Sequence, residues 1–473
     1  MIEKIRLIPA TADSHPFAHA AEKCRFSEIG YIEDEYFMWG TANVYEIGED
    51  DAPAVICKDA PYVNRFLVRR PAQVSRFSGN VVIEILNATS RMDIDRMWVN
   101  SWKYFTRNGD IYIGITSKSD VLDSLYKIDF KRYSTLSWAN PLPNRPAPPV
   151  SPFGFCPQYE FGLFWDMLTD LAKALRTPND INPISEYGDS KLYLAGWSQS
   201  AGYVVRYVKS FAYLPENDAG MPVFDGYMAA GGSANPAPVN SYQPLKLPGK
   251  DYFSSVGAGL MGAREPYIAI NTESENESVK WKGDSDIPGA LFRAYEFPGS
   301  SHDTVNNLLE WYKDDKDPVI TGTEQLYRGV DEGKPNDYPY ECLFNAAFRN
   351  LYCWVREGVP APHADTIKIG ADGKNITDIF GNAVGGVRSP FIDLPTATYS
   401  GFCTFPDGNK GVFGHALPFS TERMKAIYGS LERYRRLAEK STDAAVALGF
   451  ILASERDKVV GLAVERARSA GLE

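Results

Sequence analysis

Short apolar runs alternate with amphipathic stretches through the first two thirds of the chain. Each apolar run has turn-forming residues at its ends, which is typical of a buried strand, and apolar residues recur at helical spacing between several runs. Strand, helix and strand in this order predict parallel pairing, because the helix carries the chain back to the same end of the sheet. The predicted strands are Val81–Leu86, Ile111–Thr116, Lys191–Ala195, Gly226–Gly232, Tyr267–Asn271 and Leu291–Phe297, and the predicted helices include Ser101–Thr106, Phe161–Leu175 and Tyr203–Lys209.

Two earlier segments, from about Tyr31 to Glu46 and from Tyr62 to Val68, mix aromatic and polar residues as antiparallel strands do. Pro71 ends the second run, since proline cannot continue a central strand. The sequence therefore predicts an α/β fold with a mostly parallel central sheet preceded by antiparallel N-terminal strands.

A proline-rich segment interrupts this pattern after Thr116. Its prolines exclude regular helix and central strand, and a loop of this length in a compact domain is usually functional or disordered. We interpret residues 117–160 as an insertion that is either a lid over a pocket or a rigid surface connection. Because it follows the carboxyl end of a strand, we expect it to border the entrance of the site. The prolines are Pro141, Pro143, Pro146, Pro148, Pro149, Pro152 and Pro157.

The chain from Asp314 onward consists of predicted loops and helices. Apolar stripes predict helices over Leu343–Trp354, Glu422–Lys440 and Ala444–Arg468, which we expect to pack against the core. We predict a core over residues 1–313 and a C-terminal loop and helical extension over residues 314–473.

Composition narrows the classes of partner. The net charge of −11 and the pI of about 5.2 argue against a nucleic-acid surface. No apolar stretch reaches the length of a membrane span, and the first residues lack the apolar run of a signal peptide, which favours a cytoplasmic protein. The six cysteines lack the close spacing of a zinc site, and free thiols are expected. The sequence leaves the oligomeric state open.

A serine stands where the predicted strand Lys191–Ala195 gives way to a helix. Ser198 follows Gly196, and small residues flank it. A strand that breaks sharply into a helix at a serine lifts the hydroxyl above the sheet, where it can act as a nucleophile. The usual turn has glycine two places after the serine, where this chain has Ser200. An ordinary strand-to-helix turn is the alternative interpretation.

A serine hydroxyl needs a base, and the base needs an orienting acid. One class of serine enzymes carries them in the order serine, acid, histidine. Of the five histidines, His302 alone follows a strand end through a glycine-containing loop. The acid should follow the preceding strand, where Glu273 and Glu275 stand. We predict Glu275, because a side chain four residues past the strand has room to curl back towards the histidine, and Glu273 is the competing assignment.

Two backbone donors should stabilise the oxyanion that forms in such a reaction. One is the N–H of Gln199, the residue after the serine. The other should come from the loop after Val81–Leu86, where Asn87, Ala88 and Thr89 stand. The sequence does not determine the register within that loop.

Several segments resemble the bacterial and fungal α/β-hydrolase-domain proteins, a family of largely unassigned substrates within the α/β-hydrolase superfamily. The resemblance covers nearly the whole chain and implies the α/β-hydrolase fold and serine esterase chemistry, in which Ser200 is not anomalous. It implies no particular substrate. Arg388 is a candidate contact for a substrate carboxylate, with a structural salt bridge as the alternative. The matching segments are Val82–Asn87, Gly196–Gly202, Pro298–His302, Trp354–Pro362, Gly381–Pro390 and Asp393–Tyr399.

We therefore expect a serine hydrolase that cleaves a small-molecule carboxylic ester through an acyl-enzyme. Ser198 would attack, His302 would act as general base and acid, and Glu275 would orient His302. No cofactor and no metal is implied. An acyltransferase or a peptidase would use the same three residues. The alternative from another class is a catalytically silent hydrolase fold that serves as a binding protein, although such proteins commonly lose one of the three.

Overall fold

The computed structural model describes residues 1–48, 52–148, 155–218, 220–232, 236–243, 263–277, 281, 283–322, 333–404 and 410–473. Within this part, the chain divides into two compact units. The first contains Met1–Tyr267, Ile287–Leu291 and Lys316–Thr323, and the second contains Ile268–Asp286, Phe292–Asp315 and Glu324–Glu473. The boundary that the sequence predicts near residue 313 stays a prediction.

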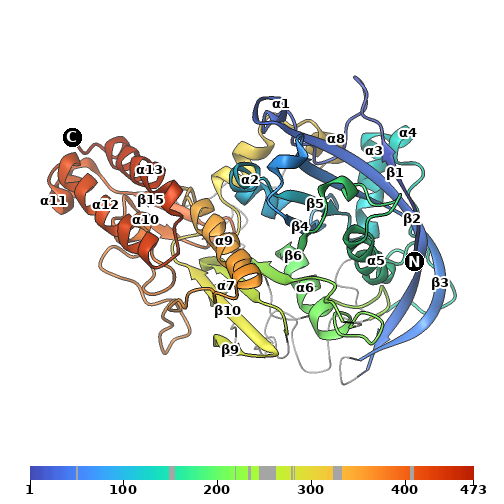
Figure 1. Ribbon diagram of the computed structural model, residues 1–473. Helices are drawn as coiled ribbons and strands as arrows, with labels where there is room; N and C mark the ends of the chain where they lie inside the picture. The colour runs from blue at the N-terminus through green and yellow to red at the C-terminus, as the bar shows by residue number, and fades with distance from the viewer. Residues whose placement is uncertain are drawn as a thin grey trace. The chain divides into compact units, whose positions relative to one another are not determined.

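The central strands of the first unit pair in parallel, as the alternation of apolar runs predicts (Figure 1). Strand β4 (Asn80–Ile85) lies between β5 (Ile111–Ile115) and β6 (Lys191–Trp197), and β7 (Gly226–Ala230) pairs with the far side of β6. Every residue of β4, β5 and β7 is buried. Strands covered on both faces read as continuous apolar runs, which is why these were visible in the sequence.

Antiparallel strands precede the parallel ones. Strand β1 (Ile2–Ile8) pairs with β2 (Tyr31–Ile47), which pairs with β3 (Pro53–Pro71) over most of its length, and β3 pairs with β5. The two predicted antiparallel strands are therefore confirmed. The bounds of β2 are close to the predicted ones, whereas β3 is longer than the run Tyr62–Val68, and β1 was not predicted. The order in this unit is β1-β2-β3-β5-β4-β6-β7.

Helices connect the parallel strands of the first unit. Helix α2 (Arg96–Asn108) ends at Gly109, whose φ of 84° lets the chain turn back into β5. Its first turn is fixed by the buried Glu84 of β4, whose carboxylate accepts hydrogen bonds from the N–H groups of Met97 and Trp98. The other helices of this unit are α1 (Phe26–Ile29), α3 (Leu122–Ile128), α4 (Phe130–Tyr133), α5 (Phe164–Arg176), α6 (Gln199–Ser210) and α8 (Asp317–Thr321).

The proline-rich segment is irregular where it is described, from Pro141 to Pro148 and from Phe155 to Pro157. Pro149 and Pro152 lie outside the described residues. The predicted insertion over residues 117–160 also contains α3 and α4, which the sequence interpretation missed because these helices are short. That this insertion borders the entrance of the site stays a prediction.

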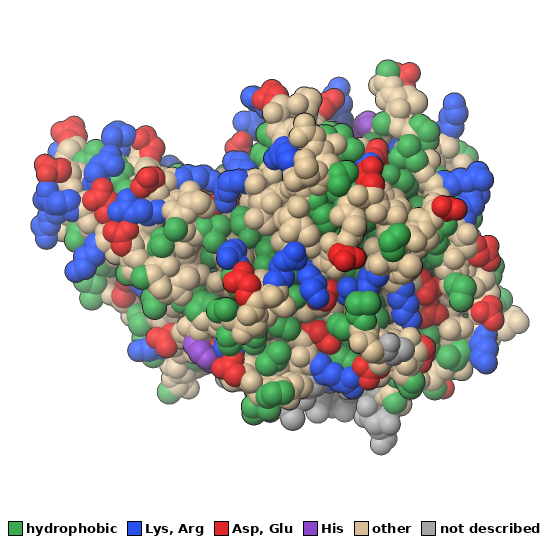
Figure 2. Space-filling view, in the orientation of Figure 1, with side chains coloured by type: hydrophobic (Ala, Val, Ile, Leu, Met, Phe, Trp, Pro, Cys, Tyr) green, Lys and Arg blue, Asp and Glu red, His purple; other side chains and the backbone are tan. Residues whose placement is uncertain are grey.

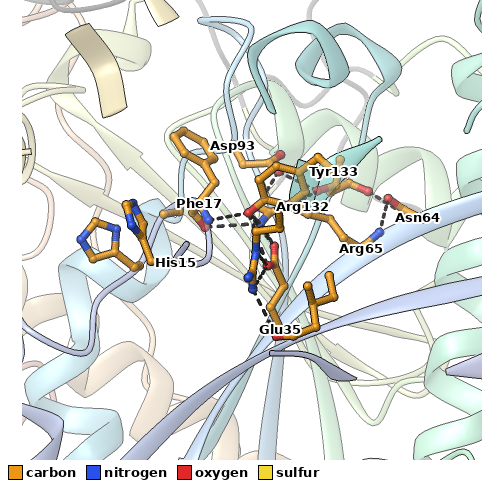
Figure 3. A network of polar contacts seen from close by, with 12 residues as sticks. His15, Phe17, Glu35, Asn64, Arg65, Asp93, Arg132 and Tyr133 are labelled. Carbon is orange, nitrogen blue, oxygen red and sulfur yellow. Dashed lines mark hydrogen bonds and ion pairs between the residues drawn. The ribbon is translucent and has the colours of Figure 1, made fainter. Parts of the chain in front are cut away.

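A buried polar network links β2, β3 and α4 (Figure 3). The guanidinium of Arg65 bonds the carboxylates of Glu35 and Asp93, and Arg132 bonds the other oxygen of Glu35 at 2.6 Å. Tyr133 donates its hydroxyl hydrogen to Glu35 at 3.0 Å. Removing one partner from such a network leaves a buried charge unpaired, which commonly costs about 3–5 kcal/mol.

The second unit contains most residues of β8 (Tyr267–Thr272), β10 (Ala290–Phe297) and β9 (Ser285–Ile287), which neighbour one another in that order. Two small sheets accompany them, β11-β15-β12 and β13-β14. Their strands are β11 (Lys334–Pro335), β12 (Ala397–Ser400), β13 (Cys403–Thr404), β14 (Lys410–Gly411) and β15 (His415–Pro418), and the helical elements are α7 (Glu273–Asn276), a π-helix (Val305–Glu310), α9 (Glu341–Glu357), α10 (Pro390–Asp393), α11 (Thr421–Tyr428), α12 (Leu431–Ala447) and α13 (Arg456–Ser469).

The C-terminal helices differ from the predicted ones in where they break. A single helix over Glu422–Lys440 is wrong, because Gly429 adopts a φ of 77° between α11 and α12 and Ser430 caps the second helix. The predicted helix Ala444–Arg468 is likewise divided, since Gly449 has a φ of 80° and α13 begins only at Arg456. The helix predicted over Leu343–Trp354 is confirmed as part of α9.

Both signs of charge are interspersed over α11, α12 and α13 (Figure 2). Several side chains there form ion pairs, including Arg436 with Glu432 and Arg456 with Asp443. None of the helices described is long and apolar enough to cross a bilayer. The six cysteines all lie in the described part and are free thiols.

Candidate active site

The chain turns sharply at Ser198, between the end of β6 at Trp197 and the start of α6 at Gln199. Ser198 has φ 58° and ψ −119°, a conformation that is strained for a residue with a Cβ atom. Its N–H donates to the carbonyl oxygen of Ala230 in β7 at 2.8 Å, which fixes the turn to the neighbouring strand. The sharp strand-to-helix turn that the sequence predicts at Ser198 is therefore present, with the serine in a strained conformation.

Small residues are required around this turn. A Cβ atom on Gly196 would lie 2.5 Å from the carbonyl oxygen of Ser200, and one on Gly232 would lie 2.5 Å from that of Ser198. Ser200, where the usual turn has glycine, is buried and donates its hydroxyl hydrogen to the carbonyl oxygen of Leu86 at 3.2 Å. The serine thus adds a link between the turn and the loop after β4.

That loop supplies the second set of predicted donors. The side-chain amide of Asn87 donates to the carbonyl oxygen of Trp197 at 2.9 Å, and its backbone N–H donates to Ile94 at 3.0 Å. The N–H of Thr89 donates to Asn87 Oδ1 at 2.8 Å. Within the described residues, the backbone N–H groups of Ala88 and Gln199 make no hydrogen bond. The side chain of Asn87 thus holds this loop against the end of β6.

The second unit brings His302 and Glu275 together. Nδ1 of His302 lies 2.7 Å from Oε1 of Glu275, and both side chains are largely buried. The other carboxylate oxygen of Glu275 accepts from the N–H of Thr272 at 2.8 Å and from its hydroxyl at 2.7 Å. These bonds close a capping box at the start of α7, so the short helix orients the carboxylate towards the imidazole.

Ser274 holds the backbone of His302. Its hydroxyl oxygen accepts from the His302 N–H at 2.9 Å, and the same hydroxyl donates to the carbonyl oxygen of Gly401. The sequence interpretation missed Thr272 and Ser274. The spacing Thr272-x-x-Glu275 is a capping-box signature that could have identified Glu275 and Thr272 together.

Glu273 makes different contacts from Glu275. Its carboxylate accepts from the N–H groups of Gly299 at 2.6 Å and Gly401 at 3.3 Å. Burial raises its pKa to about 7, against the effect of these donors. Glu273 thus fastens the start of the histidine loop, whereas the contact with the imidazole belongs to Glu275.

Ser198, Gln199, Asn87 and Ala88 belong to the first unit, and Glu275 and His302 belong to the second. Arg388 forms an ion pair with Asp393 at 2.8 Å, which favours its structural interpretation. Of the other histidines, His363 contacts Asp284 and His415 contacts the carbonyl oxygen of Phe402. His15 and His19 lie beside Asp317, a cluster that the sequence interpretation missed although the spacing His15-x-x-x-His19 hinted at it.

No curated protein matches the sequence. Among solved structures, the chain is similar to a siderophore hydrolase from Aspergillus nidulans, with 14% identity, coverage of 66% of this chain and 96% of that chain, and a TM-score of 0.29. It is also similar to a fungal esterase from Rhizomucor miehei, with 10% identity, coverage of 67% and 93%, and a TM-score of 0.28. At these TM-scores, neither likeness carries an argument.

The family comparison is of a different kind, because it spans almost the entire chain. The model described as "Alpha/beta hydrolase domain" matches residues 4–461. The mixed sheet with antiparallel N-terminal strands and the helical C-terminal region are the fold that the sequence predicts. The chain belongs to this alpha/beta hydrolase family and has the α/β-hydrolase fold.

Proposed function

We propose that this protein is a serine hydrolase that cleaves a carboxylic ester through an acyl-enzyme intermediate. The observation that carries the proposal is the bond of 2.7 Å between Nδ1 of His302 and Glu275. A carboxylate that holds Nδ1–H leaves Nε2 as the basic nitrogen, which is the tautomer that a general base for a serine requires.

Ser198 is the proposed nucleophile. In the first step, Nε2 of His302 takes the hydroxyl proton while the serine oxygen attacks the ester carbonyl carbon. The resulting imidazolium is stabilised by Glu275, whose second oxygen is held by Thr272. His302 then gives the proton to the departing alkoxide, which leaves the acyl group on Ser198. Water activated by His302 releases the acid and restores the serine.

Two backbone donors are proposed for the oxyanion of the tetrahedral intermediates. The N–H of Gln199 lies at the start of α6, where the helix dipole favours negative charge. The N–H of Ala88 is the second donor, and Asn87 contributes by tying the loop to the carbonyl oxygen of Trp197. Removing one donor of an oxyanion hole typically lowers kcat by about a hundredfold to a thousandfold.

The substrate class is a small-molecule ester, and the chemistry calls for no cofactor. Acyl transfer to an alcohol, or cleavage of a peptide, would use the same residues with another acceptor or leaving group. The binding-protein alternative differs, because it predicts a serine that does not react.

Labelling with a fluorophosphonate probe tests the proposal. We expect the probe to modify Ser198 in the native protein, and we expect both Ser198→Ala and heat-denatured protein to remain unlabelled. Ser200→Ala is the matched control, because it removes a neighbouring hydroxyl that the proposal does not use as a nucleophile. Labelling that survives in Ser198→Ala, or its absence from native protein, would contradict the proposal. A panel of esters that differ in acyl length and alcohol size then identifies the substrate class.

A further inference from the structure

We propose that His15, His19 and Asp317 form a binding site for one divalent transition-metal ion. In the described part of the chain, they are the one group of three metal-ligating side chains whose ligand atoms all lie within 4.8 Å of one another. All three belong to the first unit. The proposed ester hydrolysis uses none of them.

The distances suit an ion of the size of Zn²⁺. Nε2 of His15 lies 3.3 Å and 3.2 Å from the two carboxylate oxygens of Asp317, and Nδ1 of His19 lies 3.9 Å from the nearer one. Zn²⁺ binds imidazole nitrogen and carboxylate oxygen at about 2.0–2.2 Å, which sets tetrahedral ligand atoms roughly 3.3 Å apart. The pair formed by His15 and Asp317 already has this spacing, and a shift of less than about 1 Å brings His19 to it.

The two imidazoles are neighbours. Their ring centroids lie 4.4 Å apart with the rings edge-on. Two imidazoles and one carboxylate are the donor set of several zinc sites, and softer ligands are not needed for an ion of this class. Three protein ligands leave at least one position for water or another small ligand.

Hydrogen bonds with buried side chains hold the backbone of the segment between the two histidines. Phe17 accepts at its carbonyl oxygen from Arg65 at 3.3 Å and donates its N–H to Tyr133 at 2.8 Å, so it is tied to the buried polar network. Figure 3 shows His15 beside this network. The carbonyl oxygen of Ala18 accepts from Arg69, and Ala18 has a φ of 61°. A backbone fixed in this way reduces the entropy that ligand binding would otherwise cost.

The burial of the three side chains forms a gradient from the interior to solvent. The side chain of Asp317 is 4% exposed, that of His19 is 21% exposed and that of His15 is 49% exposed. The exposed side at His15 gives the ion a path to the site.

Zinc titration of metal-free protein tests this proposal. After treatment with EDTA, we expect the wild-type chain to bind one Zn²⁺ in isothermal titration calorimetry and to gain a few degrees in Tm, because a ligand of the folded state stabilises it. His15→Ala should weaken binding by at least about tenfold to a hundredfold, and it should remove the gain in Tm. The exposure of His15 makes this variant safe for folding.

His363→Ala is the matched control. Its imidazole also contacts carboxylates, Asp284 at 2.9 Å and Asp286 at 3.2 Å, and it should keep the wild-type affinity. Co²⁺ gives a second readout, since ligation by nitrogen and oxygen alone produces no sulfur-to-metal charge-transfer band. The proposal is overturned if the wild-type chain binds no Zn²⁺ at micromolar concentration, if His15→Ala binds as tightly, or if bound Co²⁺ shows thiolate ligation.

Discussion

Ser198 and His302 are held in place by different kinds of interaction. Ser198 depends on the backbone: a φ of 58°, a hydrogen bond from its own N–H, and glycines that admit close approach. His302 depends on side chains, because Glu275 fixes its ring and Ser274 fixes its N–H. The first arrangement is sensitive to added volume, whereas the second is sensitive to the loss of a single oxygen or charge. Substitutions that add volume should therefore disturb Ser198, whereas substitutions that remove a polar atom or a charge should disturb His302.

The largest effect is expected from Glu275→Gln. An amide has nearly the size of the carboxylate, but it cannot stabilise the imidazolium and can hold the wrong tautomer, so kcat should fall by about ten-thousandfold. Turnover of an activated ester, with folding checked by circular dichroism, measures this effect. Glu273→Gln is the matched control and should keep nearly the wild-type kcat above pH 8. If Glu273→Gln is the crippled variant, the assignment of the acid is wrong by two residues.

Glu273 should instead make the stability of the fold depend on pH. Its folded-state pKa of about 7 lies above its ordinary value of 4.5, so ionisation destabilises the fold. The wild type should therefore gain stability as the pH falls from 8 through 7 towards 5, by an amount on the order of 3 kcal/mol from this group. Glu273→Gln should lack that part of the gain, which a comparison of Tm against pH for both proteins measures. Identical slopes would rule out this role.

At the turn around Ser198, an added methyl group should lower the stability of the fold. In Gly196→Ala, the new methyl would lie 2.5 Å from the carbonyl oxygen of Ser200, and the strain should cost about 1–3 kcal/mol as well as displace Ser198. Gly461→Ala is the opposite case, since no atom lies within 4 Å of that Cβ and alanine is the better helix former by roughly 0.5–1 kcal/mol. Thermal denaturation of the pair should give shifts of opposite sign. A shift of Gly196→Ala that matches Gly461→Ala would contradict the steric argument.

The smallest effects should come from two buried serines, Ser200 beside Ser198 and Ser274 beside His302, whose hydroxyl groups each hydrogen-bond a neighbouring segment. Ser200→Ala removes the bond to Leu86, and Ser274→Ala removes the bonds to His302 and Gly401, so each should cost about 1 kcal/mol or slightly more. We expect Ser274→Ala to lower kcat by roughly tenfold, because a 1.4 kcal/mol loss of positioning in the transition state has that effect. Ser200→Ala should change kcat less. Equal kcat values for both variants would show that the position of His302 is no more sensitive to the loss of one hydroxyl group than that of Ser198.

The sequence predicted the features that depend on neighbouring residues. Buried parallel strands appear as continuous apolar runs, and the strand–Ser198–helix pattern is contained in a few consecutive residues. Glu275 followed from its offset from β8, although its partner Thr272 did not. The sequence could not predict which N–H groups of residues 87–89 donate to other residues of the loop, because those hydrogen bonds form only in the folded loop.

Features formed by distant residues were missed for a simple physical reason. Asp317 is 302 positions from His15, and no periodicity connects them. The ties of Arg65 to Glu35 and Asp93 likewise follow from strand pairing and folding, not from a local pattern. The breaks at Gly429 and Gly449 were present in the sequence, but a glycine within an amphipathic stretch does not by itself end a helix.

The hydrogen bond from Asn87 to Trp197 spans 110 positions of the chain. During synthesis, at about 5–20 residues per second, this contact must wait for several seconds after Asn87 has emerged. Strand β4 spends that interval with one edge lacking β6, its eventual neighbour, since β5 is made first. Long-range parallel pairing is slow and leaves an apolar edge open to other chains. We therefore expect assembly of the sheet around β4 to be the aggregation-sensitive stage of biogenesis, so that chaperone supply improves the yield of folded protein and slower translation lowers it.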